Sequence, residues 1–367
     1  MKKQTITNLI FALAAICLLA ILIAYFTGAT AYLGPAALLF FLLLSLGFSG
    51  SESLRGYVFP SVIFAGVALA LTYPQYFQYV GDFKLTDLII PLIQIIMFGM
   101  GTAMSVGDFA AVAKSPKGVM VGVSAQLLIM PVIGYALAAA SDFPPEIAAG
   151  IVLIGCSPSG VASNVMAYLA KANLALSITI TSIATLIAPF VTPVMMKFLA
   201  GEYVDIDVLA MMWSITKMII LPIGAGLLFN HLRGDRAGWL DRAMPLLSMT
   251  AIAVIIVIIT AAGRDSLLDI GALLMLLVLI HNLCGYVIGY WYARLLGMEE
   301  RDARTISIEV GMQNAGLASG IANSLGKIAT MGLAPAVFGP LMNITGSVLA
   351  SYWHKKPPAG KKPKQEA

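Results

Sequence analysis

The chain has 367 residues, of which 59% are hydrophobic and 11% are charged, and its mean hydropathy is +0.91. One water-soluble core cannot bury this much apolar surface, so the composition indicates a polytopic membrane protein. The net charge of +4 reflects basic loops on one side of a membrane and a basic tail, and it does not indicate nucleic-acid binding. Cys17, Cys156 and Cys284 lack the spacing of a metal site or a disulfide framework.

Apolar stretches of about 20 residues, the length that spans a bilayer, recur along the chain between short charged or Pro/Gly loops. They are too long for the strands of a membrane barrel. We expect about twelve transmembrane helices, at residues 8–26, 32–48, 57–76, 88–106, 118–139, 146–169, 174–199, 208–229, 246–262, 270–295, 305–324 and 331–353. The first stretch follows Lys2 and Lys3 as in a signal peptide. We expect it to be retained, because it is long for a signal and because retention gives an even number of helices.

Lysine and arginine are distributed unevenly between the predicted loops, and this bias sets the orientation. With both termini in the cytoplasm, five of the 22 basic residues lie outside: Lys84, Lys197, Lys217, Arg264 and Lys327. We therefore predict a multi-pass protein with both ends on the cytoplasmic side.

Two of the predicted helices contain residues that interrupt a helix. Within 146–169, the run GCSPSG from Gly155 combines Pro158, which lacks a backbone donor, with two glycines. Within 305–324, the glycine-containing run 311–320 begins just after Glu309. Each interrupted helix precedes one long final helix, and an odd number of helices separates the two sets. Paired interruptions in two inverted halves are typical of the binding site of a secondary transporter.

Glu309 is a carboxylate at a position where a membrane helix is normally apolar. A carboxylate at membrane depth costs several kcal/mol and usually marks an ion or substrate pathway. The inner helices contain no obvious lysine or arginine partner for it. We therefore interpret Glu309 as a cation ligand.

Two long runs, GCSPSGVASNVMAYLAKANLALSITITS from Gly155 and SIEVGMQNAGLA from Ser307, resemble the bile acid:sodium symporter family, specifically its bacterial members. The likeness extends over residues 88–353 and includes MFGMG from Met97 and NITGS from Asn343. It implies an all-α fold of inverted five-helix repeats, about ten helices in a panel and a core domain, with two broken helices that cross. It also implies a sodium-coupled symporter of an organic anion in the bacterial inner membrane, which works by alternating access and is not an enzyme.

The resemblance further implies two co-transported sodium ions at the crossing. Carried over position by position, the first ion would be bound by Ser163, Asn164, Ser177, Thr181 and Glu309. The second would be bound by Gln126, Glu309, Val310, Met312 and Gln313, with Val310 and Met312 contributing backbone carbonyls. Hard cations prefer oxygen ligands, and Ser177 and Thr181 share a helix face. Taken alone, these two hydroxyls would more often bond their own backbone, and Gln126 would bridge two helices.

The substrate implied by the resemblance is an organic anion, either bile acid-like or a small carboxylate such as pantoate. Family positions assign Asn314 and Asn343 to the cavity, and Ser159 and Gly160 stand where a half-helix terminus can meet a carboxylate. The family often has a histidine where this chain has Met342, and this departure concerns the substrate more than the ions. The other partners are the lipid bilayer and sodium, and the sequence does not predict an oligomeric state.

The predicted organisation has three parts. Residues 1–52 form an extra N-terminal transmembrane hairpin that the family-like region does not include. Residues 53–355 form the transporter domain, and residues 356–367 form a basic, disordered cytoplasmic tail.

Two alternatives remain open at the level of the sequence. A lone carboxylate can carry a proton, so a proton-coupled carrier or a uniporter on the same fold is one alternative. The other is an intramembrane serine protease, in which a serine of GCSPSG is the nucleophile and His281 is the base. His281 is more simply explained as a packing residue, although a proton relay is compatible with its position.

Overall fold

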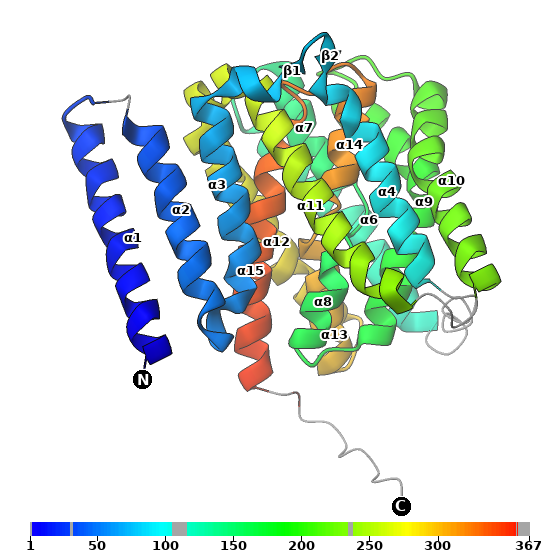
Figure 1. The fold of residues 1–367 in the computed structure, drawn as a ribbon. Helices are drawn as coiled ribbons and strands as arrows, with labels where there is room; N and C mark the ends of the chain where they lie inside the picture. The colour runs from blue at the N-terminus through cyan, green and yellow to red at the C-terminus, as the bar shows by residue number, and fades with distance from the viewer. Residues whose placement is uncertain (1, 30–31, 105–115, 234–237, 357, 359–367) are drawn as a thin grey trace, which may run out of the picture.

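The computed structural model describes residues 2–29, 32–104, 116–233, 238–356 and 358, and these are almost entirely helical (Figure 1). Short 3₁₀ helices lie at η2 (Glu52–Tyr57), η3 (Pro74–Phe77) and η4 (Leu85–Leu88), and a small antiparallel hairpin, β1 (Tyr79–Val80) with β2 (Phe83–Lys84), joins α3 to α4. The fourteen α-helices of the described residues are α1 (Lys2–Phe26), α2 (Leu33–Ser49), α3 (Val58–Thr72), α4 (Ile89–Ala103), α6 (Pro116–Ala139), α7 (Pro145–Cys156), α8 (Ala162–Leu169), α9 (Leu174–Ala200), α10 (Val208–Arg233), α11 (Gly238–Ala262), α12 (Arg264–Leu295), α13 (Glu300–Gly311), α14 (Ala315–Ser324) and α15 (Leu333–Lys355).

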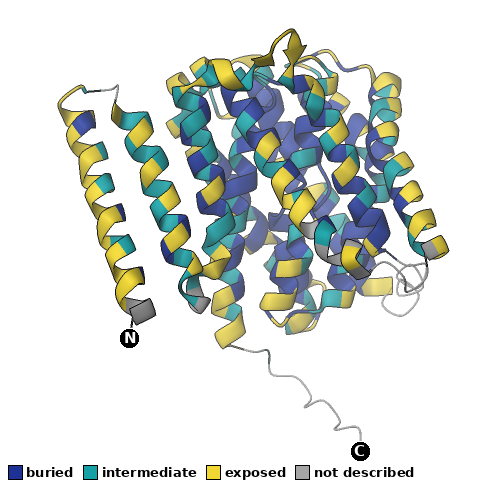
Figure 2. Cartoon of the chain, in the orientation of Figure 1, coloured by how far each residue is buried: buried dark blue, intermediate teal, exposed yellow. Residues whose placement is uncertain are grey.

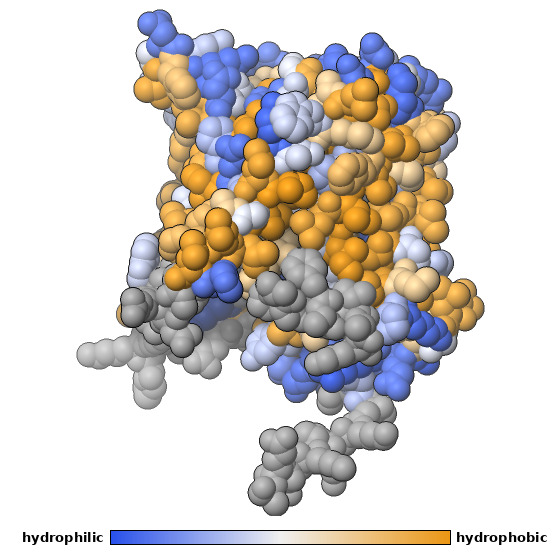
Figure 3. Space-filling model, turned by 90° about the vertical axis from the view of Figure 1, so that its right-hand side faces the viewer, coloured by the Kyte–Doolittle hydropathy of each residue, from blue (hydrophilic) through white to orange (hydrophobic). Residues whose placement is uncertain are grey.

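The predicted all-α membrane fold is confirmed. Eight helices in the described residues are long and apolar enough to cross a membrane, namely α1, α3, α4, α6, α9, α10, α12 and α15. Helices α2 and α7 and the second part of α11 are shorter but apolar. The face in Figure 3 carries a broad hydrophobic zone between hydrophilic ends. Helices suit this environment because they satisfy their own backbone groups, which hydrocarbon cannot do.

The two predicted interruptions are also confirmed. The predicted helix 146–169 is realised as α7, which ends at Cys156, and α8, which begins at Ala162. The predicted helix 305–324 is realised as α13 and α14, separated by residues 312–314. Three helices begin clearly earlier than predicted, namely α1 at Lys2 and not at residue 8, α11 at Gly238 and not at residue 246, and α12 at Arg264 and not at residue 270. Polar residues at their starts continue the helix, but hydropathy detects only the apolar part.

The N-terminal segment forms a helical hairpin at one side of the molecule (Figure 1). Helix α1 packs on α2, and α2 packs on α3. Aromatic rings form the contacts, with Phe11 and Phe48 at 5.7 Å between ring centroids and Phe41 stacked on Phe64 at 5.3 Å. The boundary of this hairpin at residue 52 stays a prediction, and most of the predicted tail at 356–367 lies outside the described residues.

The remaining helices form two groups by their contacts. Helices α3, α4, α10 and α11 pack on one another, and we call them the panel group. Helices α6 to α9 and α12 to α15 form the core group, in which α12 contacts α6, α13 and α15. The order of elements repeats, since α3 to α9 and α10 to α15 each contain a broken helix before their last helix. Figure 1 shows α7 and α14 near one end of the molecule and α8 and α13 near the other, so the two repeats are inverted.

The broken helices occupy the most buried part of the core group. Residues 147–156 of α7 and 303–311 of α13 are buried along their whole length. Figure 2 shows the same distinction, with buried helices inside the molecule and exposed residues along α1. This burial is consistent with a polar site that neither lipid nor bulk water contacts.

Glycines allow the closest helix contact of the panel group, which lies between α4 and α10. A Cβ atom added to Gly101 would lie 2.3 Å from the carbonyl oxygen of Ile223, and one added to Gly226 would lie 2.3 Å from that of Phe98. Contacts this short with backbone atoms are not relieved by side-chain rotation. The two helices therefore approach each other because both lack a Cβ there, as small residues allow in membrane proteins.

We expect Gly226→Ala to lower the thermal stability of the protein in detergent, with an overpacking cost of about 1–3 kcal/mol. Gly224→Ala is the matched control, because a Cβ on Gly224, two residues away on α10, meets nothing within 4 Å. Helix propensity alone favours alanine over glycine by about 1 kcal/mol, so the control should be neutral or stabilised. Equal melting temperatures for the two variants would contradict the predicted contact.

Candidate functional site

Glu309 lies near the end of α13, is fully buried, and has its carboxylate surrounded by hydroxyl groups. Oε1 accepts hydrogen bonds from Ser163 Oγ of α8 at 2.7 Å and from Ser177 Oγ of α9. Oε2 accepts from Ser159 Oγ, in the break between α7 and α8, at 2.6 Å and from Thr181 Oγ1 of α9 at 2.7 Å. The carboxylate of one broken helix is therefore held by the other broken helix and by the helix that follows it.

The side-chain oxygen of Asn164 belongs to the same cluster. Asn164 Oδ1 lies 2.8 Å from Ser177 Oγ and 3.3 Å from Thr181 Oγ1. The structure thus brings together all five residues predicted for the first sodium ion. Ser159, which was predicted to contact substrate, lies in this cluster as well, and its hydroxyl is directed at Glu309.

The hydroxyls around Glu309 have fewer protons than contacts. Each of the four carries one proton, yet they take part in nine oxygen–oxygen contacts of hydrogen-bond length, some of them to Asn164 Oδ1 and Gly160 O. Two oxygens in contact without a proton between them repel each other in a buried site. A cation among them would replace this repulsion with coordination. The donor set, which consists of carboxylate, hydroxyl and amide oxygens, therefore fits a hard cation.

The two breaks are joined by backbone hydrogen bonds. Ser159 and Gln313 form an antiparallel bridge, in which Gly160 N donates to Met312 O at 3.1 Å and Asn314 N donates to Pro158 O at 2.8 Å. A Cβ on Gly160 would lie 3.1 Å from Gln313 O, so glycine permits the close approach. Interrupting a buried helix normally leaves polar groups unpaired, and here each interruption supplies partners for the other.

Of the residues predicted for the second ion, Gln126, Val310 and Gln313 are joined by hydrogen bonds at this bridge. Gln126 Nε2 of α6 donates to Gln313 Oε1 at 2.6 Å and to Ser157 O at 3.1 Å. Gln313 Nε2 donates to Val310 O at 2.7 Å. Gln126 Oε1 is buried and has no hydrogen-bond partner. An acceptor left without a donor in a buried site is costly, and a cation would satisfy it.

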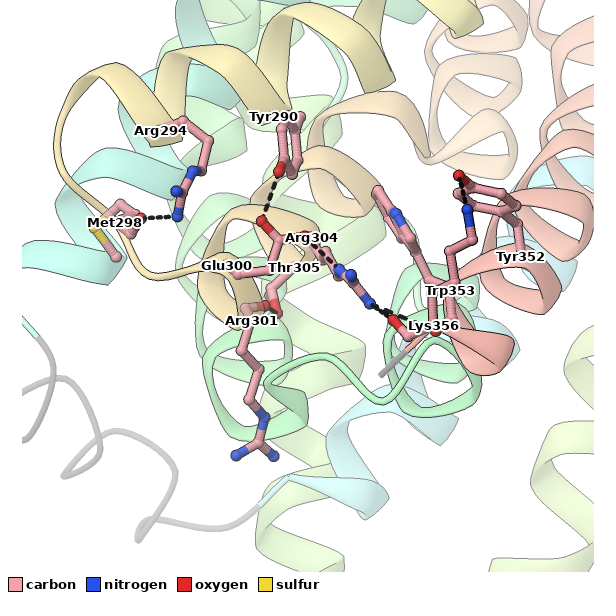
Figure 4. A network of polar contacts seen from close by, with 10 residues as sticks. All are labelled: Tyr290, Arg294, Met298, Glu300, Arg301, Arg304, Thr305, Tyr352, Trp353 and Lys356. Atoms are coloured by element: carbon pink, nitrogen blue, oxygen red, sulfur yellow. Dashed lines mark hydrogen bonds and ion pairs between the residues drawn. The ribbon is translucent and has the colours of Figure 1, made fainter. Parts of the chain in front are cut away.

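Polar contacts fix both ends of the broken helices. At the end of the molecule that carries the two termini, Arg304 of α13 donates to Glu300 Oε1 at 2.7 Å and to Lys356 O at 2.7 Å, beyond the end of α15 (Figure 4). Asn173, which precedes α9, donates to Asp302 Oδ1 at 2.8 Å. At the other end, Glu146 of α7 pairs with Lys327, which lies between α14 and α15. These contacts hold the half-helices in the core group, so they position the crossing.

Of the residues predicted to bind substrate, Ser159, Gly160 and Asn314 are buried, and Asn343 is partly exposed. Asn314 caps α14, with Oδ1 accepting from Leu317 N at 3.0 Å, and Gly160 lies beside it. Asn343 of α15 donates to Gly339 O at 2.8 Å. A small pocket lies between α11 of the panel group and α14 and α15 of the core group, and it is lined by Ile252, Ile255, Ile256, Ala315, Gly316, Ser319 and Pro335. The pocket begins at the first turn of α14, directly after Asn314.

Sequence reasoning did not single out two buried hydroxyls as candidate cation ligands. The first is Ser159, discussed above. The second is Thr185, one turn beyond Thr181 on α9, which is fully buried and whose Oγ1 has no hydrogen-bond partner. The spacing of four residues from Thr181 is a signal that could have identified Thr185, because it repeats the spacing between Ser177 and Thr181.

The fold and this site define a class of protein. Two inverted repeats, with broken helices that cross at a buried carboxylate, form the architecture of a secondary transporter. The model of the Sodium Bile acid symporter family matches residues 90–270 of this chain. The protein "Uncharacterized sodium-dependent transporter YocS" of Bacillus subtilis (strain 168) is 37% identical over 296 residues, which cover 80% of this chain and 89% of that protein. The chain belongs to the Sodium Bile acid symporter family.

Relatives in plants extend the same likeness. "Probable sodium/metabolite cotransporter BASS1, chloroplastic" of Arabidopsis thaliana is 30% identical over 300 residues, which cover 82% of this chain and 74% of that protein. "Probable sodium/metabolite cotransporter BASS6, chloroplastic" of the same plant is 33% identical, and the match covers 75% of it. These proteins are named as transporters, and the chain is an integral membrane transporter and not an enzyme.

The protease interpretation is therefore wrong, and the contacts of its residues agree. Ser157 Oγ donates to Leu153 O of its own helix at 2.9 Å, and Ser159 Oγ donates to Glu309. His281 is fully buried, with Nε2 at 2.9 Å from Met130 O and its ring against Phe338. The histidine and the two serines make separate contacts in the core group.

Proposed function

We propose that the protein couples the movement of an organic anion to two sodium ions, which bind on either side of the crossing between the broken helices. The observation that carries this proposal is the buried carboxylate of Glu309, surrounded by four hydroxyls that contact more oxygens than their protons can serve. The first ion would lie among Ser163, Asn164, Ser177, Thr181 and Glu309. Ser159 would act as a further ligand of this ion, because its hydroxyl reaches the same carboxylate.

The second ion would be bound by Gln126, Gln313 and Glu309 with the carbonyls of Val310 and Met312. The unpartnered Oε1 of Gln126 supports this assignment, because it is a buried oxygen available to a cation. Glu309 would be shared between the two ions, so one negative charge would offset part of two positive charges. Neutral oxygens supply the remaining ligands, which favours sodium over a proton, since a proton needs only one acceptor.

The substrate is proposed to be an organic anion with an apolar part. The small pocket between the two helix groups would have to widen to hold the anion, and it presents three isoleucines of α11 on one side and the first turn of α14 on the other. Isoleucines suit an apolar body, while the N-terminus of α14 and the side chain of Asn314 suit a carboxylate. None of the lining residues is basic, so backbone and amide donors would recognise the anion.

The transport cycle follows from the shared site. Sodium bound at the crossing would order the break from Met312 to Asn314, and this ordering would complete the anion site at the start of α14. The core group would then move against the panel group, with α7, α8, α13 and α14 moving together because their ends are fixed. The ions drive this change only by binding one state more tightly than the other. Two sodium ions with one monovalent anion carry a net charge of +1, worth about 2.3 kcal/mol per 100 mV.

Transport with sodium replaced by choline tests the coupling. We expect purified protein in proteoliposomes, at fixed pH, to accumulate the anion under an inward sodium gradient and to stop when choline replaces sodium. Accumulation driven equally well by a pH gradient in choline would identify a proton-coupled carrier. Equilibration without accumulation in either salt would identify a uniporter. The reversal potential of the coupled flux would give the number of sodium ions per anion.

The substrate can be found by thermal shift. A ligand that binds the folded protein raises its melting temperature in proportion to the logarithm of its concentration above Kd. Bile acid-like anions, hydroxy acids such as pantoate and longer aliphatic carboxylates would be compared in sodium and in choline. We expect the substrate to stabilise the protein more strongly in sodium.

We place the protein in the bacterial plasma membrane with both termini in the cytoplasm. The excess of lysine and arginine in the loops assigned to the cytoplasm supports this orientation, and so does the position of the two ends on one side of the molecule (Figure 1).

A further inference from the structure

Asn282 is a fully buried amide of α12 that contacts the second broken helix directly. Its Nδ2 donates to the carbonyl of Gly311, the last residue of α13, at 2.8 Å. Its Oδ1 accepts a hydrogen bond from Thr345 Oγ1 of α15 at 2.6 Å. Both ends of the amide are used, so a carbonyl on one side and a hydroxyl on the other fix its orientation.

The carbonyls at the end of α13 have no partners further along the helix, as at any helix terminus. Three successive ones are paired from three different directions. Val310 O accepts from the Gln313 side chain, Gly311 O accepts from Asn282, and Met312 O accepts from Gly160 N. Two of these three carbonyls are the proposed ligands of the second sodium ion. The Gly311 carbonyl lies between them in the chain, and its peptide group is planar, so holding it restricts the directions of both neighbours.

The backbone of the break also lies directly on α12. A Cβ on Gly285 would lie 3.0 Å from Gly311 Cα and 3.3 Å from Val310 O. A Cβ on Gly311 would lie 2.2 Å from the ring of Tyr286. Residues 310–311 therefore pack directly against α12, and Asn282 donates a hydrogen bond across this contact.

We propose that Asn282 is a positioning residue of the second sodium site and that Thr345 acts through Asn282 by holding its amide. This inference rests on the proposed sodium coupling. It assigns no direct contact with the ion to either residue. Thr345 stands two residues from Asn343 on α15, so the same contact links the sodium carbonyls to the helix that is predicted to line the substrate site.

Sodium alone is the probe for the test, which uses the full-length protein in detergent. Thermal stability is titrated with sodium chloride, and choline chloride keeps the ionic strength constant. We expect Asn282→Leu to raise the sodium concentration for half-maximal stabilisation about tenfold, since partners that orient metal ligands typically contribute tenfold or more to affinity. Thr345→Val should shift it in the same direction, and Thr345→Ser, which keeps the hydroxyl, should restore the wild-type value. The double variant should shift it no further than Asn282→Leu alone.

Thr260→Val is the matched control. Thr260 is buried on α11, and its hydroxyl bonds only the preceding turn of its own helix, at Ile256 O. A merely structural role for Asn282 or Thr345 would lower the melting temperature in choline without moving the sodium midpoint. That result, or a sodium titration of Asn282→Leu that superimposes on those of wild type and Thr260→Val, would overturn the proposal.

The outcomes separate this proposal from the one on which it rests. If sodium stabilises the wild type but Asn282→Leu responds equally, only the role of Asn282 is lost. If sodium stabilises the wild type no more than choline does, the sodium sites and the role of Asn282 fall together. If Asn282→Leu does not fold, the comparison of Thr345→Val with Thr345→Ser decides the matter, because equal sodium midpoints for those two variants would also overturn it.

Discussion

Glu309→Gln is expected to abolish both sodium-dependent stabilisation and sodium-driven uptake while leaving the protein folded. Glutamine has nearly the same shape as glutamate and can still accept hydrogen bonds, so the cluster of hydroxyls keeps its packing. What is lost is the only charge among the proposed ligands. Two opposite charges 4 Å apart at an effective dielectric constant of about 20 interact by roughly 4 kcal/mol, which corresponds to about a thousandfold in affinity.

Glu202→Gln is the control for this change, because Glu202 is an exposed residue in the loop between α9 and α10. It removes the same charge without touching the site and should leave the sodium titration unchanged. The glutamine variant also separates sodium from proton coupling, since a neutral amide resembles a protonated carboxylate. A Glu309→Gln protein that still exchanges anion across the membrane would indicate a proton carrier. Wild-type sodium dependence in this variant would refute the assignment of Glu309 as a ligand.

The membrane fold was predictable because it depends on composition and on helix length. The two interruptions were predictable for local reasons. In the first, Pro158 removes a backbone donor and the nearby glycines weaken the helix, and in the second, glycines follow shortly after Glu309. Glu309 was identifiable because a carboxylate is rare at membrane depth. Each of these features is expressed within one short segment of sequence.

Which serine of the first break contacts Glu309 was harder to predict, because the break removes the helical period. Ser157 and Ser159 differ by two residues, and no helical spacing applies across Pro158 to say which of them points inward. In the structure Ser157 bonds its own helix, whereas Ser159 reaches Glu309. Within α9 the period holds, so Ser177 and Thr181 were expected on one face, and both contact the carboxylate.

The backbone pairing of the two breaks and the contact between the two helix groups were beyond sequence reasoning. The pairing of Gly160 with Met312 and of Asn314 with Pro158 depends on how the two inverted repeats meet. The pocket against the isoleucines of α11 depends on the approach of the panel group to α14. Asn282 and His281 are neighbours in the sequence, and nothing there distinguishes their roles. In the structure the Asn282 amide donates to Gly311 O at the break, whereas the His281 ring packs against Phe338.

The second large effect is expected from Thr181→Val, which should raise the half-saturating sodium concentration about 10- to 100-fold. Thr181 Oγ1 lies 2.7 Å from Glu309 Oε2 and 3.3 Å from Asn164 Oδ1, so it stands between two of the proposed ligands. Valine keeps the branched shape and the packing on α9 but replaces the hydroxyl with a methyl group. A methyl group supplies no lone pair to a cation and leaves the first ion with one ligand fewer.

Thr179→Val is the matched control for Thr181→Val. Thr179 is equally buried on the same helix, and its hydroxyl donates to Ala175 O at 2.7 Å. Two residues along a helix turn the side chain to a different face, away from the Glu309 cluster. Both variants lose one hydroxyl from a buried threonine of α9, so they should lose similar stability in choline, while only Thr181→Val should move the sodium midpoint. Equal midpoints for the two would mean that Thr181 contributes packing and not a ligand, and the first sodium site would then have to be assigned without it.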